Sequence, residues 1–166
     1  MRYVRGNHEA WIDIKKELDI SLMEDEDFTV PKVLGFDDLD ILYYPKFYEY
    51  QKFMFEHGNY LGVPSAAAKK QMLDEFKSGV SVHLHREGEY RHTTREEEFV
   101  WTILGCGCKL EMWYDLKGVP RHRSHWNHSF AIINFIDDRF ETTTVRVIKG
   151  KCYYDGKLFD GGKKYQ

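Results

Sequence analysis

The stretch Met1-Arg2-Tyr3-Val4-Arg5-Gly6-Asn7-His8-Glu9 decides how the rest of the chain is interpreted. Its first residues include aromatic and β-branched side chains and stop at Gly6, a pattern typical of a strand that ends in a tight turn. Residues 9–18 then place apolar side chains at partly helical spacing. The sequence therefore predicts a strand that passes through Gly6-Asn7-His8-Glu9 into a helix.

Length and composition favour one domain. The chain has 166 residues, 42% of them hydrophobic and 16% aromatic, which is enough for one sizeable core. We expect a single domain over residues 1–160 and a flexible tail over residues 161–166, which begins Gly161-Gly162-Lys163-Lys164. The net charge of −3 excludes a globally basic surface, so any attraction to nucleic acid must come from a local patch.

Cysteine usage and the N-terminal residues predict a soluble, cytoplasmic protein that does not bind membranes. Three cysteines are few for a disulfide scaffold, which indicates reduced thiols. The charged N-terminus lacks the apolar segment of a signal peptide, and no apolar run approaches the roughly 20 residues of a membrane-spanning helix. Cys106 and Cys108 form a C-x-C pair, which is either part of a structural zinc site or a pair of ordinary buried thiols. The lack of a second pair favours buried thiols.

Beyond the first turn, the chain shows one clear helix and many strands, so the fold class is mixed α/β. Pro64-Ser65 supplies a helix start, and the pattern predicts a helix over residues 66–77 that Gly79 ends. We expect strands over residues 41–44, 51–55, 80–85, 99–104, 109–114, 130–136, 142–148 and 152–159. Turns are predicted at Asp137-Asp138 and Asp155-Gly156.

Four residues near predicted strand ends have side chains suited to a transition metal. Asn7, His57, His83 and His85 offer an amide oxygen and imidazole nitrogens, a set that suits Mn, Fe, Zn or Ni better than Ca. Because side chains alternate along a strand, residues 80–85 would place His83 and His85 on one face. Two imidazoles on one strand face can reach two adjacent metal ions, so the sequence predicts that this pair takes part in metal binding.

The order of these residues resembles a known family. Gly6-Asn7-His8-Glu9, then His57-Gly58, then Val82-His83-Leu84-His85-Arg86 is similar to the C-terminal part of the motif series of calcineurin-like metallophosphoesterases. That series runs D-x-H, G-D-x-x-D, G-N-H-[ED], H and G-H-x-H. Trp126-Asn127-His128-Ser129-Phe130 is also similar to a W-N-H-G-F segment of some phage and bacterial members. The resemblance implies an α/β fold in which mixed sheets form a sandwich flanked by helices.

The resemblance also implies a metal centre. Asn7, His57 and His83 would be ligands of one metal and His85 a ligand of another, each metal being divalent Mn, Fe, Zn or Ni. The implied activity is hydrolysis of a phosphomonoester or phosphodiester, with a nucleic acid or nucleotide among the substrates considered.

Roles for the remaining site residues follow from the same resemblance or from proximity. His8 would act as the catalytic residue that faces the phosphate, and Glu9 would orient the turn. Arg86, Arg121 and Arg123 are candidates for substrate contact, because guanidinium groups bind phosphate in bidentate fashion. Trp126, next to the last two, either stacks on a base or packs inward before the following strand.

Two family motifs, D-x-H and G-D-x-x-D, do not precede Gly6, and the first strands of the fold would be missing with them. We expect their ligands to come from an upstream or separately encoded N-terminal part, so that the isolated chain binds about one metal weakly. Replacement by Asp37, Asp38 and Asp40, or by Asp137 and Asp138, is the less favoured alternative. The unpaired sheet edge predicts capture of that part or self-association. The alternative function is a non-catalytic remnant that binds nucleic acid or protein.

Overall fold

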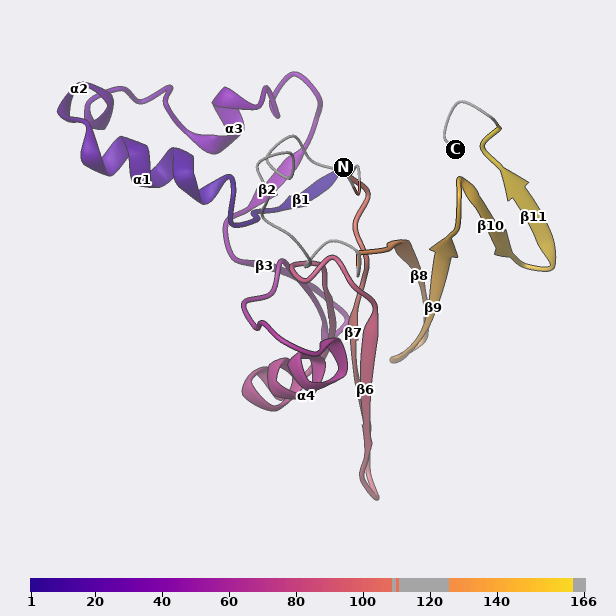
Figure 1. Cartoon of the computed structure of the whole chain (residues 1–166). Helices are drawn as coiled ribbons and strands as arrows, with labels where there is room; N and C mark the ends of the chain where they lie inside the picture. Colours follow the sequence, from indigo (N-terminus) through magenta and orange to yellow (C-terminus); the bar gives the residue numbers. More distant parts are fainter. Residues whose placement is uncertain (109, 111–125, 163–166) are drawn as a thin grey trace.

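The computed structural model of the chain describes residues 1–108, 110 and 126–162, and its fold is mixed α/β with several sheets and few helices. Its centre is a sheet of five strands in the order β3-β4-β5-β7-β6 (Figure 1). The strands β4, β5 and β7 run parallel, and the edge strands β3 and β6 are antiparallel to their neighbours. Their bounds are β3 Phe47–Tyr50, β4 Phe53–Glu56, β5 Ser78–Ser81, β6 Gly88–Thr93 and β7 Glu98–Ile103.

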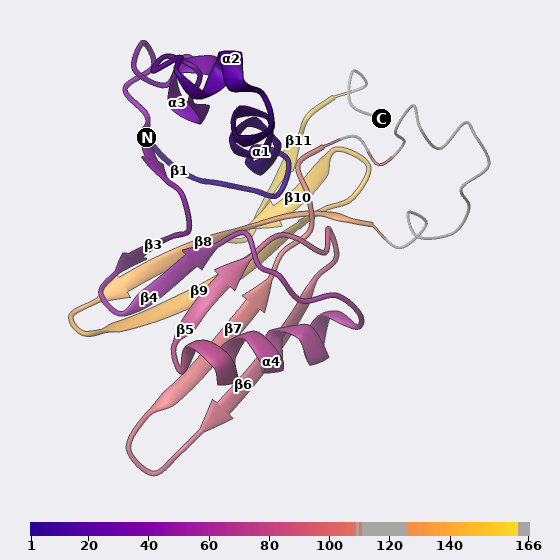
Figure 2. The ribbon, with the colours of Figure 1, turned by 90° about the vertical axis from the view of Figure 1, so that its left-hand side faces the viewer.

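Helix α4 (Pro64–Glu75) covers one face of this sheet, and the hairpin of β8 (His128–Ile136) and β9 (Arg139–Val147) covers the other (Figure 2). Successive residues of a strand point to opposite faces, so Met54 packs with the α4 cluster while Phe53 packs toward the hairpin. Trp101 is fully buried on the α4 side. The core therefore consists of two apolar layers, one on each side of the five-stranded sheet.

The helix predicted over residues 66–77 is confirmed, with α4 running from Pro64 to Glu75. Proline fits the first helical turn because its missing N–H has no partner there in any case. Phe76 ends the helix in a left-handed conformation with φ 51°, and the following Ser78 and Gly79 already belong to β5. Gly79 is therefore a strand residue, and the predicted helix stop at this position is wrong.

The predicted strand, turn and helix at the N-terminus are also confirmed. β1 (Arg2–Val4) pairs in parallel with β2 (Leu42–Tyr44), and α1 (Ala10–Leu18) follows the turn. The short helices α2 (Ile20–Met23) and α3 (Val30–Val33) complete this part (Figure 1). The apolar face of α1 is open, since Trp11 and Leu18 are 71% and 81% exposed.

The strand predicted over residues 51–55 is confirmed as β4, but the aromatic segment before it, which was not predicted as a strand, forms β3. β3 pairs with β4 in a hairpin. Gln51 and Lys52 both have positive φ, 46° and 61°, as the two central residues of a tight hairpin turn require. The aromatic side chains favour this strand, because they pack well on a pleated surface.

The prediction that residues 80–85 form one strand is wrong, because β5 ends at Ser81. The amides of Val82 and His83 both donate to the carbonyl oxygen of His57, at 3.1 and 2.9 Å. His85 then adopts φ 56°, which takes the chain out of extended geometry. His83 and His85 consequently lie on a loop and do not share a strand face.

The strand predicted over residues 152–159 is two strands, because the chain turns at Asp155-Gly156. β10 (Lys151–Tyr154) and β11 (Lys157–Asp160) form a hairpin around the predicted Asp155-Gly156 turn, and Asp137-Asp138 joins β8 to β9. The hairpin of β10 and β11 extends away from the five-stranded sheet (Figure 1). The predicted strand over residues 109–114 lies outside the described residues except for Leu110, and so does most of the predicted tail. Within the described ranges, no helix is long and apolar enough to cross a membrane.

Candidate metal centre

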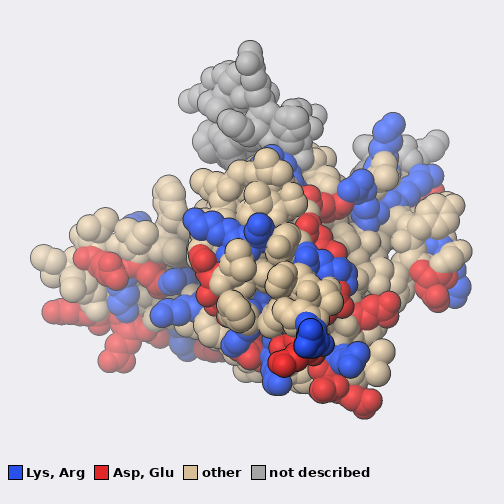
Figure 3. All heavy atoms as spheres, turned by 90° about the horizontal axis from the view of Figure 1, so that it is seen from below, with Lys and Arg blue, Asp and Glu red and all other residues tan. Residues whose placement is uncertain are grey.

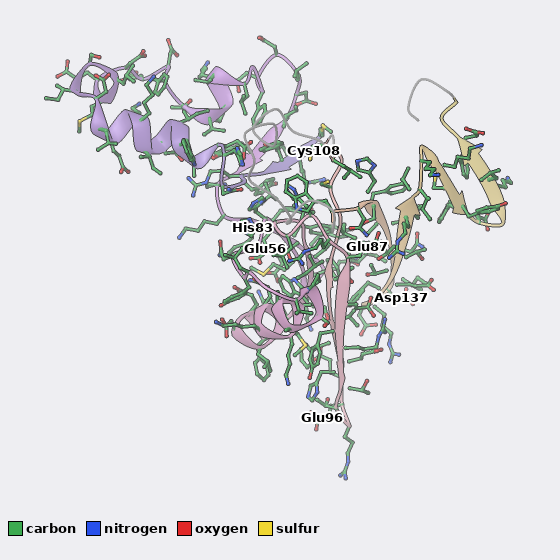
Figure 4. All side chains as sticks on the ribbon, viewed as in Figure 1. Glu56, His83, Glu87, Glu96, Cys108 and Asp137 are labelled. Atoms are coloured by element: carbon green, nitrogen blue, oxygen red, sulfur yellow. The ribbon has the colours of Figure 1, made fainter. Side chains whose placement is uncertain are left out.

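The histidines and cysteines of interest follow the carboxyl ends of the parallel strands. His57 comes directly after β4, His83 and His85 lie on the loop after β5, and Cys106 and Cys108 follow β7. Carboxyl ends of parallel strands meet at one edge of a sheet, where binding sites of α/β proteins form. Figure 4 labels His83 and Cys108, one from each of two of these loops.

The closest pair is formed by His57 and His83. Nε2 of His57 lies 2.9 Å from Nδ1 of His83, and the two rings meet edge to face with centroids 4.9 Å apart. Gly58 has φ 89°, a backbone conformation that glycine adopts without strain. A Cβ at this position would also lie 2.9 Å from the Cβ of Ser81, so glycine allows the two segments to approach closely. Two of the predicted metal ligands are thus brought together.

The N-terminal turn packs directly against this pair. A Cβ on Gly6 would lie 3.2 Å from Nδ1 of His57, so only glycine allows this approach without displacement of the ring. The Gly6 amide donates to Oε2 of Glu9 at 2.8 Å, which closes the turn. Asn7 and His8 are both exposed on this turn.

Burial keeps the imidazoles of this edge neutral. It lowers the pKa of His57 to about 4, with a further contribution from His83, while Glu9 opposes the shift. Burial also lowers the pKa of His83 and of His85, and the positive charge of a protonated His8 would add to each effect. A neutral imidazole has one nitrogen lone pair that can bind metal, although in the pair of His57 and His83 one ring N–H donates to the other ring, so a metal would replace this hydrogen bond.

Glu9 itself stays ionised in this environment. Burial alone would raise its pKa, but hydrogen bonds from its own amide, from Tyr3 and from the Gly6 amide outweigh that effect and lower the pKa. Burial, together with the hydrogen bond to the Glu9 carboxylate and the negative charge of that group, raises the pKa of Tyr3 to about 12. The turn therefore carries a fixed negative charge beside His57.

The chain matches no family model, no curated protein and no solved structure.

His85 lies beside two cysteines of the loop that follows β7. Ligand atoms of His85, Cys106 and Cys108 all lie within 4.8 Å of one another. Trp126 packs edge-on against the His85 ring with centroids 4.2 Å apart. The sequence favoured ordinary buried thiols at this C-x-C pair, and only the tertiary structure adds the histidine.

Asn127 was not predicted as a site residue, yet it connects the loops. Its amide donates to the carbonyl oxygen of His85 at 3.1 Å, and its own carbonyl oxygen accepts from the Cys106 amide at 2.9 Å. Its Oδ1 accepts from the Glu87 amide at 3.2 Å. The similarity of Trp126-Asn127-His128 to a family segment was the one sequence signal at this position.

Of the three predicted substrate arginines, Arg86 belongs to the part of the chain that the structure describes. Arg86 donates to the carbonyl oxygen of Gly62 at 2.6 Å, which holds its guanidinium against the loop before α4. Arg121 and Arg123 lie outside the described residues. On the face seen in Figure 3, basic and acidic side chains are interspersed.

The alternative carboxylate ligands lie elsewhere. Asp37, Asp38 and Asp40 are exposed after α3, and Asp137-Asp138 forms the turn between β8 and β9. A hollow of about 630 Å³ near that turn is lined by Asp138 and by Glu98, which begins β7. Since the cysteines follow the other end of β7, this hollow is remote from the histidines.

Proposed function

We propose that this chain forms part of a metal-dependent phosphoesterase site of the calcineurin-like type, which hydrolyses phosphomonoester or phosphodiester bonds. The observation that carries the proposal is the 2.9 Å separation of His57 Nε2 and His83 Nδ1, with the Gly6 turn packed against His57. These residues come from three separate segments that follow each other in the order of the family motifs. Packing of the β8–β9 hairpin and of α4 on opposite faces of the sheet supports the family's layered fold.

The donors at this edge fit a divalent transition metal. His57 and His83 offer two imidazole nitrogens and Asn7 an amide oxygen, a set that suits Mn, Fe, Zn or Ni. Burial lowers the pKa of both histidines, so both imidazoles are uncharged near pH 7, and a metal would take the place of the hydrogen bond between them. When bound, the metal supplies positive charge that polarises the phosphoryl group. In the family scheme His85 belongs to a second such metal.

His8 and Glu9 have different roles in this proposal. His8 is exposed beside the half-buried histidines, so its imidazole reaches a phosphate at this edge and donates a proton to the leaving oxygen. Glu9 acts as a positioning residue, because its carboxylate accepts the Gly6 N–H and holds the turn that carries Asn7 and His8.

The proposal includes a second segment that supplies further ligands. The 166 residues contain neither a D-x-H nor a G-D-x-x-D motif, so the family's carboxylate ligands have to come from another polypeptide segment. The exposed apolar side chains Trp11 and Leu18 of α1 offer such a segment a surface. The isolated chain should therefore bind one metal weakly and hydrolyse little. The three free thiols support a reducing, cytoplasmic location.

Metal titration with matched histidine variants tests this function. Mn²⁺ binding to the purified chain is measured by calorimetry, and hydrolysis of bis-p-nitrophenyl phosphate is measured in parallel. His57→Gln and His83→Gln should each weaken Mn²⁺ binding by at least about tenfold, whereas His92→Gln, at an exposed position of β6, should not. Equal Mn²⁺ binding in all four proteins would refute the assignment. Brisk hydrolysis by the isolated chain, lost in His83→Gln, would remove the need for a second segment.

A further inference from the structure

We propose that His85, Cys106 and Cys108 form a binding site for one soft divalent metal ion, with Zn²⁺ as its occupant. One imidazole nitrogen and two thiolate sulfurs are a ligand set that selects zinc over Mg, Ca or Mn. The three ligand atoms lie within 4.8 Å of one another. Ligand atoms of a tetrahedral zinc site are about 3.5–3.8 Å apart, so side-chain shifts of about 1 Å complete the geometry.

The environment of His85 supports a ligand at this position. Its Nδ1 is buried and has no hydrogen-bond partner among the residues that the structure describes. Buried polar atoms are nearly always paired, so an unpaired one indicates an interaction that a bound ion would supply. His85 also adopts φ 56°, a left-handed conformation that is unfavourable for a residue other than glycine. The fold therefore holds this ring beside the cysteines at an energetic cost.

The cysteine loop is fixed by hydrogen bonds to the start of β8. The Cys106 amide donates to the carbonyl oxygen of Asn127 at 2.9 Å, and the Gly105 amide donates to Oγ of Ser129 at 2.7 Å. Nε2 of His128 lies 2.7 Å from the carbonyl oxygen of Cys108. Since the Asn127 amide also donates to the His85 carbonyl oxygen, one short segment positions both halves of the site.

This site is separate from the pair of His57 and His83 in its ligands. In the family scheme His85 would bind the second phosphoesterase metal. Here Cys106 and Cys108 lie beside it, so His85 would share a different metal ion with these two cysteines. Three protein ligands leave a fourth coordination position open, which is the arrangement of reactive zinc sites more than of structural ones. The inference does not depend on the proposed function, because neither Asn7, His57 nor His83 is among its ligands.

Cobalt spectroscopy of the reduced, metal-free chain tests the site. Co²⁺ substitutes for Zn²⁺, and a Co²⁺–thiolate bond produces a charge-transfer absorption in the near ultraviolet. We expect this band to saturate at one equivalent of Co²⁺ and to disappear when Zn²⁺ is added. Cys106→Ser and Cys108→Ser should each weaken Co²⁺ binding by more than about 100-fold, because loss of an outer partner of a ligand alone costs about 10–100-fold. His85→Gln should weaken it similarly.

Matched controls separate this site from the phosphoesterase site and from misfolding. Cys152→Ser, at the third cysteine on β10, and His57→Gln should both keep the band. In the unmodified protein, Zn²⁺ should protect two of three thiols from a disulfide thiol reagent, a readout that needs no variant. Absence of the band, or a band of full strength in Cys106→Ser and Cys108→Ser, would overturn the proposal. Loss of Mn²⁺ binding in His57→Gln with the thiolate band kept would support both sites.

Discussion

Replacing Glu56 by glutamine should stabilise the protein above pH 7 and leave its stability unchanged below about pH 4.5. Glu56 ends β4, directly before His57, and its Oε1 is buried without a hydrogen-bond partner in the described part of the chain. Burial, and then repulsion by Glu75, raise the pKa of Glu56 from 4.5 to about 7. A raised pKa means that the folded state prefers the protonated carboxyl. Stability is therefore full below pH 4.5 and is lost as the pH rises through 7.

The size of the effect follows from the pKa difference. A shift from 4.5 to about 7 corresponds to about 3.4 kcal/mol if solvent screening is ignored, at about 1.36 kcal/mol per pH unit. Glu56 is only half-buried, so screening by water reduces the expected gain to about 1–2 kcal/mol. With a urea dependence of about 2 kcal/mol per molar, the unfolding midpoint of Glu56→Gln should rise by about 0.5–1 M at pH 8.

Urea denaturation at pH 5 and pH 8, followed by tryptophan fluorescence, measures this difference. The change in the free energy of unfolding between pH 5 and pH 8 is measured for both proteins. Subtracting the wild-type value from that of Glu56→Gln removes the contribution of the histidines, which is the same in both. Glu96→Gln, in the exposed turn between β6 and β7 (Figure 4), is the control and should behave like the wild type. Glu75→Gln should give a smaller gain of the same sign. If wild type and Glu56→Gln lose equal stability between the two pH values, the reasoning about Glu56 is wrong.

Three further substitutions test packing around the sheet and the site. Gly79→Ala should cost about 1–3 kcal/mol in urea denaturation, because the new Cβ would lie 2.7 Å from the Trp101 ring. Ser81→Ala should cost about 1–3 kcal/mol by the same assay, since the buried indole N–H of Trp101 loses its acceptor at 3.1 Å. Gly105→Ala would press its Cβ against the carbonyl oxygen of Asn127 and should weaken Co²⁺ binding. An unchanged urea midpoint in Gly79→Ala or Ser81→Ala, or unchanged Co²⁺ binding in Gly105→Ala, would contradict the contact that the substitution tests.

Local patterns predict the elements whose stability is mostly local. The helix at Pro64–Glu75 has a proline in its first turn and a run of alanines, so its backbone preference is readable without a partner. The strand, turn and helix around Gly6 are likewise predicted by adjacent residues. The strand expected over residues 80–85 shows what local patterns cannot predict. Its residues alternate as in a strand, but the amides of Val82 and His83 both donate to the carbonyl oxygen of His57, and the strand ends. That pairing joins distant parts of the chain, so no local period encodes it.

The order of amino acids specifies which donors this protein carries and how they follow one another, because side-chain chemistry and motif spacing are properties of the chain. It indicated Asn7, His57, His83 and His85 before any contact was known. Only the tertiary structure decided how they are divided. The parallel order of β4, β5 and β7 brings His57 against His83, and the Asn127 segment ties His85 to the C-x-C pair. Such groupings depend on long-range hydrogen bonds and on buried surfaces that form only when the strands pack together.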